Sequence, residues 1–591
     1  MSNKDNSEIR LDGIGGSPGI CIGKAYLVDQ EGVEVVEKYH IEKKYLQKEK
    51  NRFKAAVKKA MDELHVIIEN TPEIYRQPAS ILETHVVLLK DKMLYGKTIE
   101  TIEEEQVNAE WALRKIVANV KSLFRNMEDA YLKERVTDIV HVSDRILRNL
   151  VGVKQVDIEN IDKRVILVAH DLSPAETSQI NLERIKGFVT DRGGRSSHTS
   201  IIARTLEIPA VQGVDSATRT IANDDLIIVD GTIGSVIVHP TKQTLADFNA
   251  RKAKYESHKV VLLKGSRLPA KTNDGFQVPV MANIELPEEV LSAMDHGGDG
   301  IGLYRTEFQY LSRRTFPGEE ELFEKYKDVV KVMAPKPVVI RTLDINGDKA
   351  LANSPDLDER NPALGLRAIR YCLRNPDIFQ TQLRAILRAA SFGNARILFP
   401  MISSNDELYQ AKQMLNRAAD SLEKEGVAFE RKIAIGILIE VPSAVVMADV
   451  MAKEVDFFSI GTNDLIQYSF AIDRENRHVS HLYRPLHPAI IRMIKQVSDV
   501  AGDNGIKTFM CGEMAGDPIH IPILLGLGMD ELSMNPQAIP AVKRMIRSLS
   551  IEDNRMFIKN VLKQDSAVDI VKLVQDVYCD SLSESENVTV A

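Results

Sequence analysis

The spacing of apolar and polar positions predicts a helical block in the N-terminal part of the chain. From about residue 33 to residue 150, charges are dense, glycine is nearly absent, and apolar residues recur every three or four positions. One face holds Ile81, Leu82, His85, Leu88 and Leu89, and a later one holds Val117, Val120 and Leu123. This is the period of helices that bury one face. We expect a helical bundle over residues 33–150, whose role does not follow from periodicity.

Strand patterns lie on both sides of this block. The glycine-rich segment that begins at Ile9 is expected to be a turn, followed by a first strand over residues 23–28. Further strand-like runs occupy residues 164–169 and 234–238. The helical block is therefore expected to be inserted in an α/β domain formed by residues 1–32 and 151–240.

The C-terminal half alternates between strand and helix patterns. After a charged helical linker over residues 241–268, the alternation occurs eight times within residues 269–578. The expected strands end near Ala282, Tyr304, Asp344, Met401, Glu440, Asn463, Cys511 and Asn535. This number of units and this length are typical of a (β/α)8 barrel of the TIM type. The predicted fold is therefore multidomain α/β, ending in a barrel and a polar, frayed tail over residues 579–591.

Composition and charge exclude several classes of protein. A chain of 591 residues is too long for one core. Its net charge of −8 argues against a nucleic-acid partner, and no apolar run approaches the ~20 residues of a membrane span. The N-terminus lacks the apolar core of a signal peptide. Four cysteines without paired spacing favour reduced thiols, and so a cytoplasmic protein.

The first candidate site is the segment Asp191–Arg204, which reads DRGGRSSHTSIIAR. Gly193 and Gly194 let a polyanion approach the main chain closely. His198 follows at the expected start of a helix, where unpaired N–H groups and the helix dipole favour phosphate. A histidine in this place is a candidate nucleophile that carries a phosphoryl group. The alternative is a polar turn that caps a helix while His198 faces water.

The second candidate site lies at the carboxyl ends of the barrel strands, where such barrels hold their active sites. The polar residues expected there are Arg305, Arg341, Glu440, Asn463, Asp464 and Cys511. The guanidinium group of arginine binds phosphate or carboxylate through two parallel hydrogen bonds, which suits a small, doubly anionic substrate. Glu440 and Asp464 are oxygen ligands of the kind that Mg2+ takes, and Cys511 is a candidate proton donor. The alternatives are ion-paired structural arginines, a solvated acid and a buried, inert cysteine.

Both segments carry a family resemblance. The sequence GGRSSHTSIIAR, followed after Thr205 by LEIPAV, resembles the phosphohistidine motif of phosphoenolpyruvate (PEP)-utilising enzymes. The resemblance implies that His198 accepts phosphate from PEP. The barrel resembles the PEP-binding barrel of the enzyme I group, which implies Mg2+ at Glu440 and Asp464 and proton donation by Cys511. The residues that it implies for PEP binding are Arg305, Arg341, Lys349, Arg367, Asn463, Asp464 and Arg474.

The length of the chain selects among the groups of this family. It has no room for the large ATP-binding domain of the dikinases and synthases, and among the groups of the family it resembles enzyme I of the bacterial phosphotransferase system. This resemblance implies transfer from PEP to His198 and then to a histidine of the phosphocarrier HPr, the first step of sugar uptake. It also implies that the helical block docks HPr, that the barrel forms a homodimer, and that the linker lets the His198 domain swivel. Two alternatives stay open, a regulator with a silent site and a stand-alone PEP or pyruvate barrel enzyme.

Overall fold

A computed structural model describes most of the chain in two compact units. The described residues are 8–28, 38–70, 86, 88–125, 139, 142–143, 145–147, 149–150, 164–172, 184–194, 198–205, 207–310, 316–345, 361–474, 476 and 478–586. One unit holds Met1–Tyr255, and the other holds nearly all of the chain after Glu256. None of the described helices has the length and apolar character needed to cross a bilayer.

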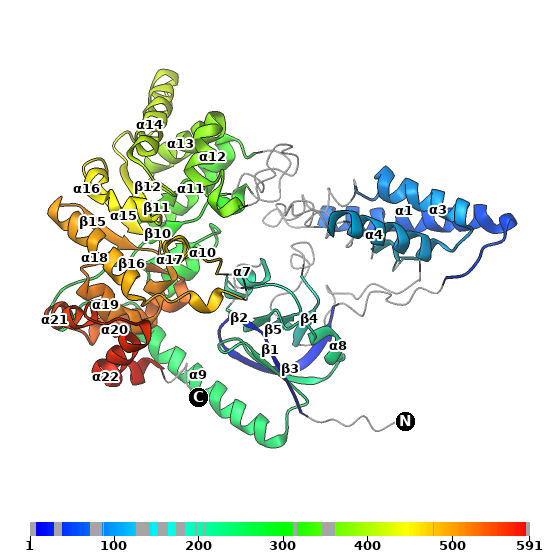
Figure 1. Ribbon diagram of the computed structural model, residues 1–591, viewed down its shortest axis with the longest axis horizontal. Coiled ribbons are helices and arrows are strands. Elements are labelled where there is room, and N and C mark those ends of the chain that lie inside the picture. The colour runs from blue at the N-terminus through cyan, green and yellow to red at the C-terminus, as the bar shows by residue number, and fades with distance from the viewer. Residues whose placement is uncertain are drawn as a thin grey trace. The chain divides into compact units, whose positions relative to one another are not determined.

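The first unit contains an eight-stranded sheet, and Figure 1 labels its strands β1 to β5. The strand order is β1-β8-β7-β3-β4-β5-β6-β2. Its strands are β1 Ile9–Asp12, β2 Ile14–Ser17, β3 Ile20–Leu27, β4 Val165–Ala169, β5 Ile185–Thr190, β6 Ala210–Gln212, β7 Leu226–Asp230 and β8 Ser235–Val238. The pairs from β3 through β6 are parallel, and the remaining pairs are antiparallel. Two short helices, α7 His198–Thr205 and α8 Ala217–Thr220, belong to this unit.

The prediction of a turn before the first strand was wrong, because that segment contains β1 and β2. Its glycines lie where two backbones approach closely. A Cβ added to Gly15 would lie 2.4 Å from the carbonyl oxygen of Gly231, and one added to Gly13 would lie 2.6 Å from that of Gln212. Glycine here permits tight strand packing, and the sequence pattern alone resembles that of a turn.

Helices occupy the sequence between the neighbouring strands β3 and β4. They include α1 Leu46–Asn70, the short helix η3 Lys92–Gly96, α3 Lys97–Glu105 and α4 Ala109–Arg125. Their core includes the fully buried residues Phe53, Leu64 and Leu113, together with Leu88, Leu89 and Val117 from the predicted faces. The other members of those faces, Ile81, Leu82, His85 and the side chains of Val120 and Leu123, lie outside the description.

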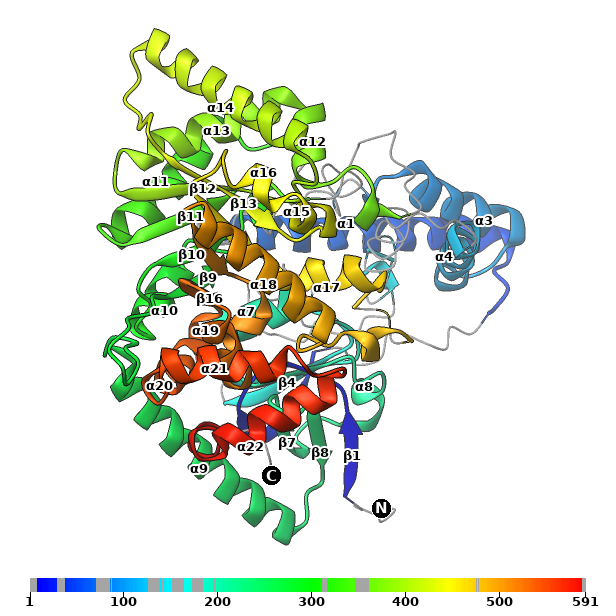
Figure 2. The ribbon, with the colours of Figure 1, turned by 60° about the vertical axis from the view of Figure 1, so that its left-hand side comes forward.

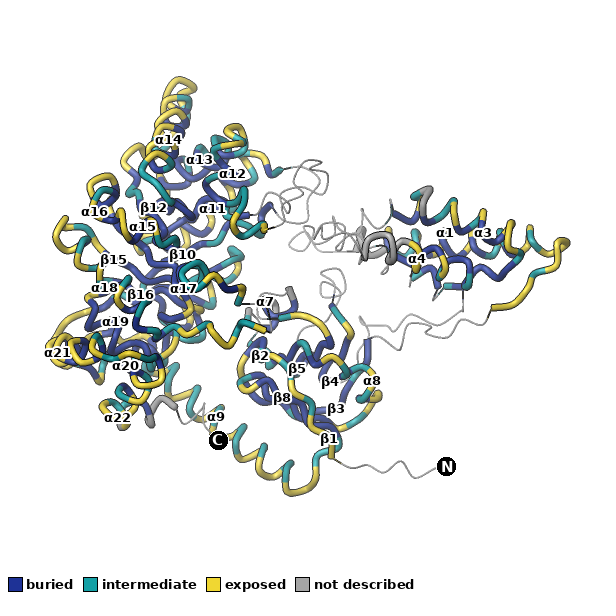
Figure 3. The backbone as a smooth tube through the Cα atoms, viewed as in Figure 1, coloured by how far each residue is buried: buried dark blue, intermediate teal, exposed yellow. Residues whose placement is uncertain are grey.

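The second unit is a closed barrel of eight parallel strands, which confirms the predicted fold class. The strands are β9 Val280–Ile284, β10 Ile301–Tyr304, β11 Pro337–Arg341, β12 Asn394–Phe399, β13 Ala434–Ile439, β14 Phe457–Ile460, β15 Lys507–Met510 and β16 Glu531–Met534. The long helix α9, Lys242–Ser266, precedes them where a helical linker was expected. Most strand residues are buried, and the helices around them expose their outer faces (Figure 3).

Helices surround the barrel in sequence order. They are α10 Glu289–Asp295, α11 Glu319–Met333, α12 Ala368–Arg374, α13 Pro376–Ala390, α14 Asn405–Glu425, α15 Pro442–Val446, α16 Ala448–Met451, α17 Thr462–Phe470, α18 Pro488–Asp503, α19 Ile521–Gly526, α20 Ile539–Arg547, α21 Ile551–Val561 and α22 Ala567–Glu586. Local signals fix their ends, as in α14, where the Ser404 hydroxyl accepts a hydrogen bond from the Glu407 N–H at 3.3 Å. Gly426, with φ +69°, ends the same helix.

The prediction of a frayed tail over residues 579–591 was wrong for most of that segment, because α22 continues through Cys579 to Glu586. Val574 and Leu582, on either side of a kink at Tyr578, are both buried. The ring of Tyr578 lies 5.1 Å from that of Phe557, edge to face. Tertiary burial of these side chains stabilises a segment that looks polar in sequence.

Candidate active site

The parallel strands bring their carboxyl ends to one mouth of the barrel. Arg305 directly follows β10, Arg341 is the last residue of β11, Glu440 directly follows β13, and Cys511 directly follows β15. Apolar runs end at these positions because the backbone leaves the buried barrel wall there. The structure therefore brings four of the predicted polar residues to the same end of the barrel.

Asn463 and Asp464 reach this end from a helix and not from a strand. The strand β14 ends at Ile460, and α17 begins at Thr462 after the single residue Gly461. The prediction that the sixth strand ends at these residues was therefore wrong by about one turn. Figure 2 shows α17 in yellow beside the orange α18.

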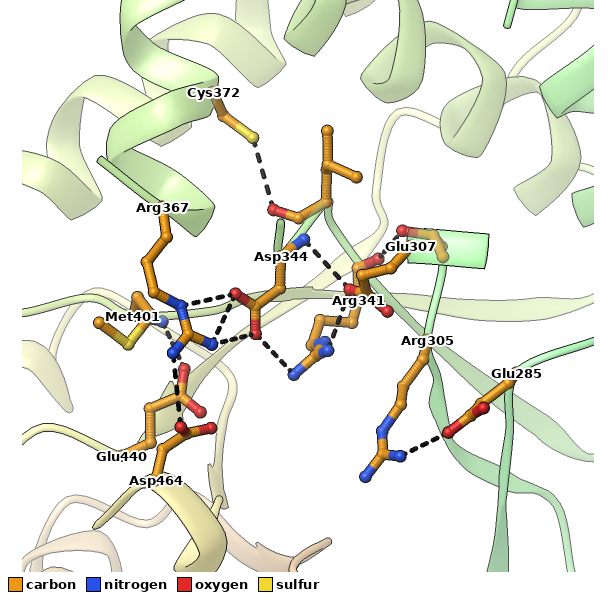
Figure 4. Close-up of polar contacts among 12 residues, drawn as sticks. Glu285, Arg305, Glu307, Arg341, Asp344, Arg367, Cys372, Met401, Glu440 and Asp464 are labelled. Atoms are coloured by element: carbon orange, nitrogen blue, oxygen red, sulfur yellow. Dashed lines mark hydrogen bonds and ion pairs between the residues drawn. The ribbon is translucent and has the colours of Figure 1, made fainter. Parts of the chain in front are cut away.

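Arg305 and Arg341 are each paired with carboxylates from neighbouring strand ends (Figure 4). Arg305 Nη1 lies 2.7 Å from Glu285 Oε1, and Arg341 Nη2 lies 2.9 Å from Glu307 Oε1. Arg341 Nη1 also lies 3.0 Å from Asp344 Oδ2. The alternative of ion-paired arginines therefore describes this state of the site correctly.

Asp344 joins two of the predicted substrate arginines. Besides Arg341, it accepts hydrogen bonds from Arg367 Nη2 at 2.9 and 3.1 Å and from Arg367 Nε at 3.2 Å. Burial opposes ionisation of Asp344, but the charges of Arg341 and Arg367 outweigh it and lower the pKa of this carboxyl. Asp344 thus fixes the spacing of the two guanidinium groups.

Arg367 and Arg341 keep further links to the site. Arg367 Nη1 lies 3.5 Å from Asp464 Oδ1 and donates to the hydroxyl of Tyr468 at 2.9 Å. The Nε of Arg341 is buried and has no hydrogen-bond partner among the described residues. A buried donor without a partner is costly unless a ligand satisfies it. The Nε–H of Arg341 is therefore a hydrogen-bond donor that a bound anion could satisfy.

Glu440 and Asp464 form a pair of carboxylates whose charges repel. Glu440 is 1% exposed, and its Oε1 accepts a hydrogen bond from the Met401 N–H at 2.6 Å. Burial raises the pKa of Glu440 well above its ordinary value, and the charges of Asp464 and Asp344 raise it further. A cation beside these oxygens would relieve both effects.

The donor set of this pair fits a magnesium ion completed by substrate. A Cβ added to Gly461 would lie 3.1 Å from Glu440 Oε2, so the glycine leaves room beside that oxygen. The described residues contain no group of three or more potential ligands gathered for a metal. Mg2+ commonly takes one or two carboxylates and obtains its other ligands from phosphate and water. The residues present therefore fit Mg2+.

Cys511 is a buried thiol at the edge of the barrel interior. Its thiol accepts a hydrogen bond from the Ser459 hydroxyl at 3.1 Å and donates to the carbonyl of Ile460 at 3.6 Å. Burial raises its pKa to about 11, so the thiol keeps its proton at neutral pH. The charges of Glu440, Arg341 and Arg305 also act on this pKa. Cys511 therefore belongs electrostatically to the charged mouth.

Arg474 and Asn463 meet at one carboxylate that sequence reasoning missed. Arg474 Nη1 lies 3.1 Å from Glu513 Oε1, and Asn463 Nδ2 donates to the same oxygen at 3.3 Å. Glu513, Glu285, Glu307 and Asp344 share one sequence signal, since each lies within three residues of the carboxyl end of a barrel strand. Of the other predicted residues, Lys349 lies outside the described part of the chain.

His198 is the first residue of α7, as the sequence predicts. The loop before it contains Gly193 with φ +108°, and the side chain of His198 lies outside the description. The Ser200 hydroxyl donates to the Gly194 carbonyl at 2.9 Å. Asp191, which starts the segment, is buried and accepts a hydrogen bond from the Thr218 N–H at 3.2 Å. The loop is thus anchored on both sides of the undescribed residues.

The chain is similar to known proteins along nearly its whole length. Models of the PEP-utilising enzyme family match residues 12–135 as the N-terminal domain, 161–234 as the mobile domain and 262–551 as the PEP-binding domain. Proteins named phosphoenolpyruvate-protein phosphotransferase are 44% identical in Bacillus sp. (strain S), 43% in Bacillus subtilis and 41% in Haemophilus influenzae. These matches cover 96–97% of this chain and 98–99% of the relatives.

Proposed function

The chain belongs to the PEP-utilising enzymes, and among them to the phosphoenolpyruvate-protein phosphotransferases, and we propose that His198 carries the phosphoryl group between two partners. It takes this group from PEP and passes it to a histidine of the phosphocarrier HPr. This is the first step of sugar uptake by the phosphotransferase system. The observation that carries the proposal is the convergence of arginines and carboxylates at the barrel mouth. The same chain also contains the His198 motif.

The arginines of the mouth bind PEP in this proposal. Arg305, Arg341 and Arg367 offer guanidinium groups that match phosphate and carboxylate oxygens. Asp344 holds two of them at a fixed spacing, and the unused Nε of Arg341 supplies a further donor. Asn463, Asp464, Arg474 and Lys349 complete the substrate-binding set that the resemblance implies. Preorganised donors of this kind stabilise the charge that develops during transfer.

Two bonds change at PEP during the first half-reaction. The imidazole of His198 forms a bond to phosphorus while the bond between phosphorus and the enol oxygen breaks, which leaves the enolate of pyruvate. The thiol of Cys511 then gives its proton to the methylene carbon, and solvent restores that proton. A thiol with a pKa of about 11 stays protonated until the enolate forms. Glu440 and Asp464 would hold Mg2+, which when bound neutralises charge on the transferring group.

The second half-reaction needs a partner protein. We assign HPr docking to the helical block at residues 33–150, and swivelling of the His198 domain to the linker at residues 241–268. The barrel is the proposed homodimer surface. Buried free thiols at Cys21, Cys372 and Cys511 suit a reducing compartment, so we place the reaction in the cytoplasm.

A regulator with a silent site is the main competing function, and it predicts a broken charge set at the mouth. The predicted arginines and carboxylates are present at the mouth, and Arg305, Arg341 and Arg367 each pair with a carboxylate. The charge set is therefore intact, which favours an active enzyme. A stand-alone PEP or pyruvate barrel enzyme would leave the first unit without a role.

The test is to incubate the full chain with PEP and Mg2+, with and without HPr, and to measure intact masses. One phosphoryl group on the chain, lost when HPr gains one, supports the two-step transfer. A chain that gains the group but does not pass it on contradicts the choice of partner. A folded chain that gains none contradicts the enzyme itself.

A further inference from the structure

The carboxylates that pair with the arginines of the mouth differ in their exposure to solvent. The side chains of Asp344, Glu307 and Glu285 are 2%, 13% and 19% exposed. That of Glu513, which pairs with Arg474, is 54% exposed. Breaking a buried pair leaves a desolvated charge, whereas a solvated pair separates at little cost. Glu513 is therefore the carboxylate that a ligand displaces most easily.

Glu513 occupies the donors of two residues that the proposed function assigns to PEP. Its Oε1 lies 3.1 Å from Arg474 Nη1 and accepts a hydrogen bond from Asn463 Nδ2 at 3.3 Å. Its own N–H donates to Asn463 Oδ1 at 3.1 Å. The side chain thus presents a carboxylate oxygen where the carboxylate or phosphate of a substrate would find the same donors.

The backbone that carries Glu513 is held against the start of α17. A Cβ added to Gly512 would lie 1.9 Å from Thr462 Oγ1, so the two segments are in close contact. The Cys511 N–H donates to the carbonyl of Ile460 at 3.1 Å, and Asn283 Nδ2 donates to the carbonyl of Cys511 at 3.0 Å. Displacement of the carboxylate therefore requires rotation of the exposed side chain, with the loop left in place.

We propose that Glu513 is a displaceable counter-ion that sets the affinity of the mouth for its anionic substrate. It holds Arg474 and Asn463 in position while the barrel is empty, and an oxygen of PEP replaces it on binding. The inference rests on the proposed function of these two residues. Each binding event then exchanges one anion for another on the same donors, so Glu513 weakens the apparent affinity for PEP.

The test compares Glu513→Gln with Glu454→Gln. The amide that replaces the Glu513 carboxylate keeps an oxygen for Asn463 but removes the competing charge. Glu454 is a matched control, since it is exposed, paired with Lys412 at 2.7 Å, and precedes β14 at the opposite end of the barrel. Because PEP no longer has to displace an exposed ion pair in Glu513→Gln, KM for PEP should be lower by about two- to fivefold. We expect this decrease in Glu513→Gln with kcat unchanged, and no change in Glu454→Gln.

Calorimetric titration of PEP in a His198→Ala background separates binding from turnover. In that background we expect Glu513→Gln to lower the Kd for PEP by the same factor as it lowers KM. We expect Glu513→Ala to lower this Kd as well. An unchanged or higher Kd in both variants overturns the proposal. If Glu513 only supported the loop, its substitution would leave PEP binding unchanged or weaken it. If PEP does not bind even when Glu513 is intact, the result contradicts the proposed function itself, and the inference that rests on it is contradicted as well.

Discussion

Glu531 is a buried acid at the end of the barrel opposite the mouth, and its replacement by glutamine should stabilise the protein at alkaline pH. It is the first residue of β16 and is 5% exposed. Its Oε1 is buried without a hydrogen-bond partner among the described residues, and Arg396 Nη1 lies 3.8 Å from its Oε2. The charge of Glu531 is thus poorly compensated.

The magnitude follows from the shifted pKa. Burial raises the pKa of Glu531 from its ordinary value of 4.5 to about 7, against the opposing charges of Arg396 and Lys507. Below pH 4.5 the carboxyl is protonated in both the folded and the unfolded chain. Between pH 4.5 and about 7 the unfolded chain releases the proton while the folded chain keeps it, so the free energy of unfolding decreases as pH rises. The loss amounts to about 3 kcal/mol and is complete above that range.

The amide introduced by Glu531→Gln has no proton to release, so this variant should lack the decrease. We expect its advantage over the parent in free energy of unfolding to grow by about 3 kcal/mol from about pH 4.5 to about pH 8. Urea unfolding followed by circular dichroism at several pH values measures this difference, with the exposed Glu552→Gln as control. A difference that is independent of pH, or one that grows toward acid, would refute the reasoning.

Three further substitutions test the mouth. Gly512→Ala places a Cβ 1.9 Å from Thr462 Oγ1, so we expect a loss of about 1–3 kcal/mol in stability and a lower kcat/KM, measured by melting and by pyruvate release. Cys511→Ser replaces the proposed acid by a weaker one, and pyruvate formation should slow by about 10²–10⁴-fold while calorimetry still detects PEP binding; loss of both would argue against proton donation. Asp344→Ala removes the shared partner of the buried Arg341 and the partly buried Arg367 and should destabilise the barrel by about 3–5 kcal/mol in urea unfolding, and an unchanged midpoint would contradict the bridging role.

The barrel was predictable from sequence because its strands are short apolar runs that end in polar residues. β10 ends one residue before Arg305, and β13 ends one residue before Glu440, so hydropathy alone places these two residues at the mouth. The carboxylate partners of the arginines were not predicted. Asp344 and Glu307 show the same strand-end signal, but pairing across strands depends on register and side-chain direction, which a single sequence does not encode locally.

Two of the errors have their origin in tertiary contacts, and the third in a short connection. Glycines that suggested a turn before β3 allow close packing of β1 and β2. Burial of Val574 and Leu582 extends α22 into a polar segment. Asn463 was expected at a strand end because only one residue separates β14 from α17.

The most direct test of the central claim is the fate of labelled phosphate from PEP in the parent and in the His198→Ala variant. The folded parent, given [32P]PEP and Mg2+, should gain one label that is stable in alkali and labile in acid, as expected for a phosphohistidine. The His198→Ala variant should gain none, while calorimetry still detects PEP binding at the barrel. Acid-labile label that persists in the variant would contradict His198 as the acceptor.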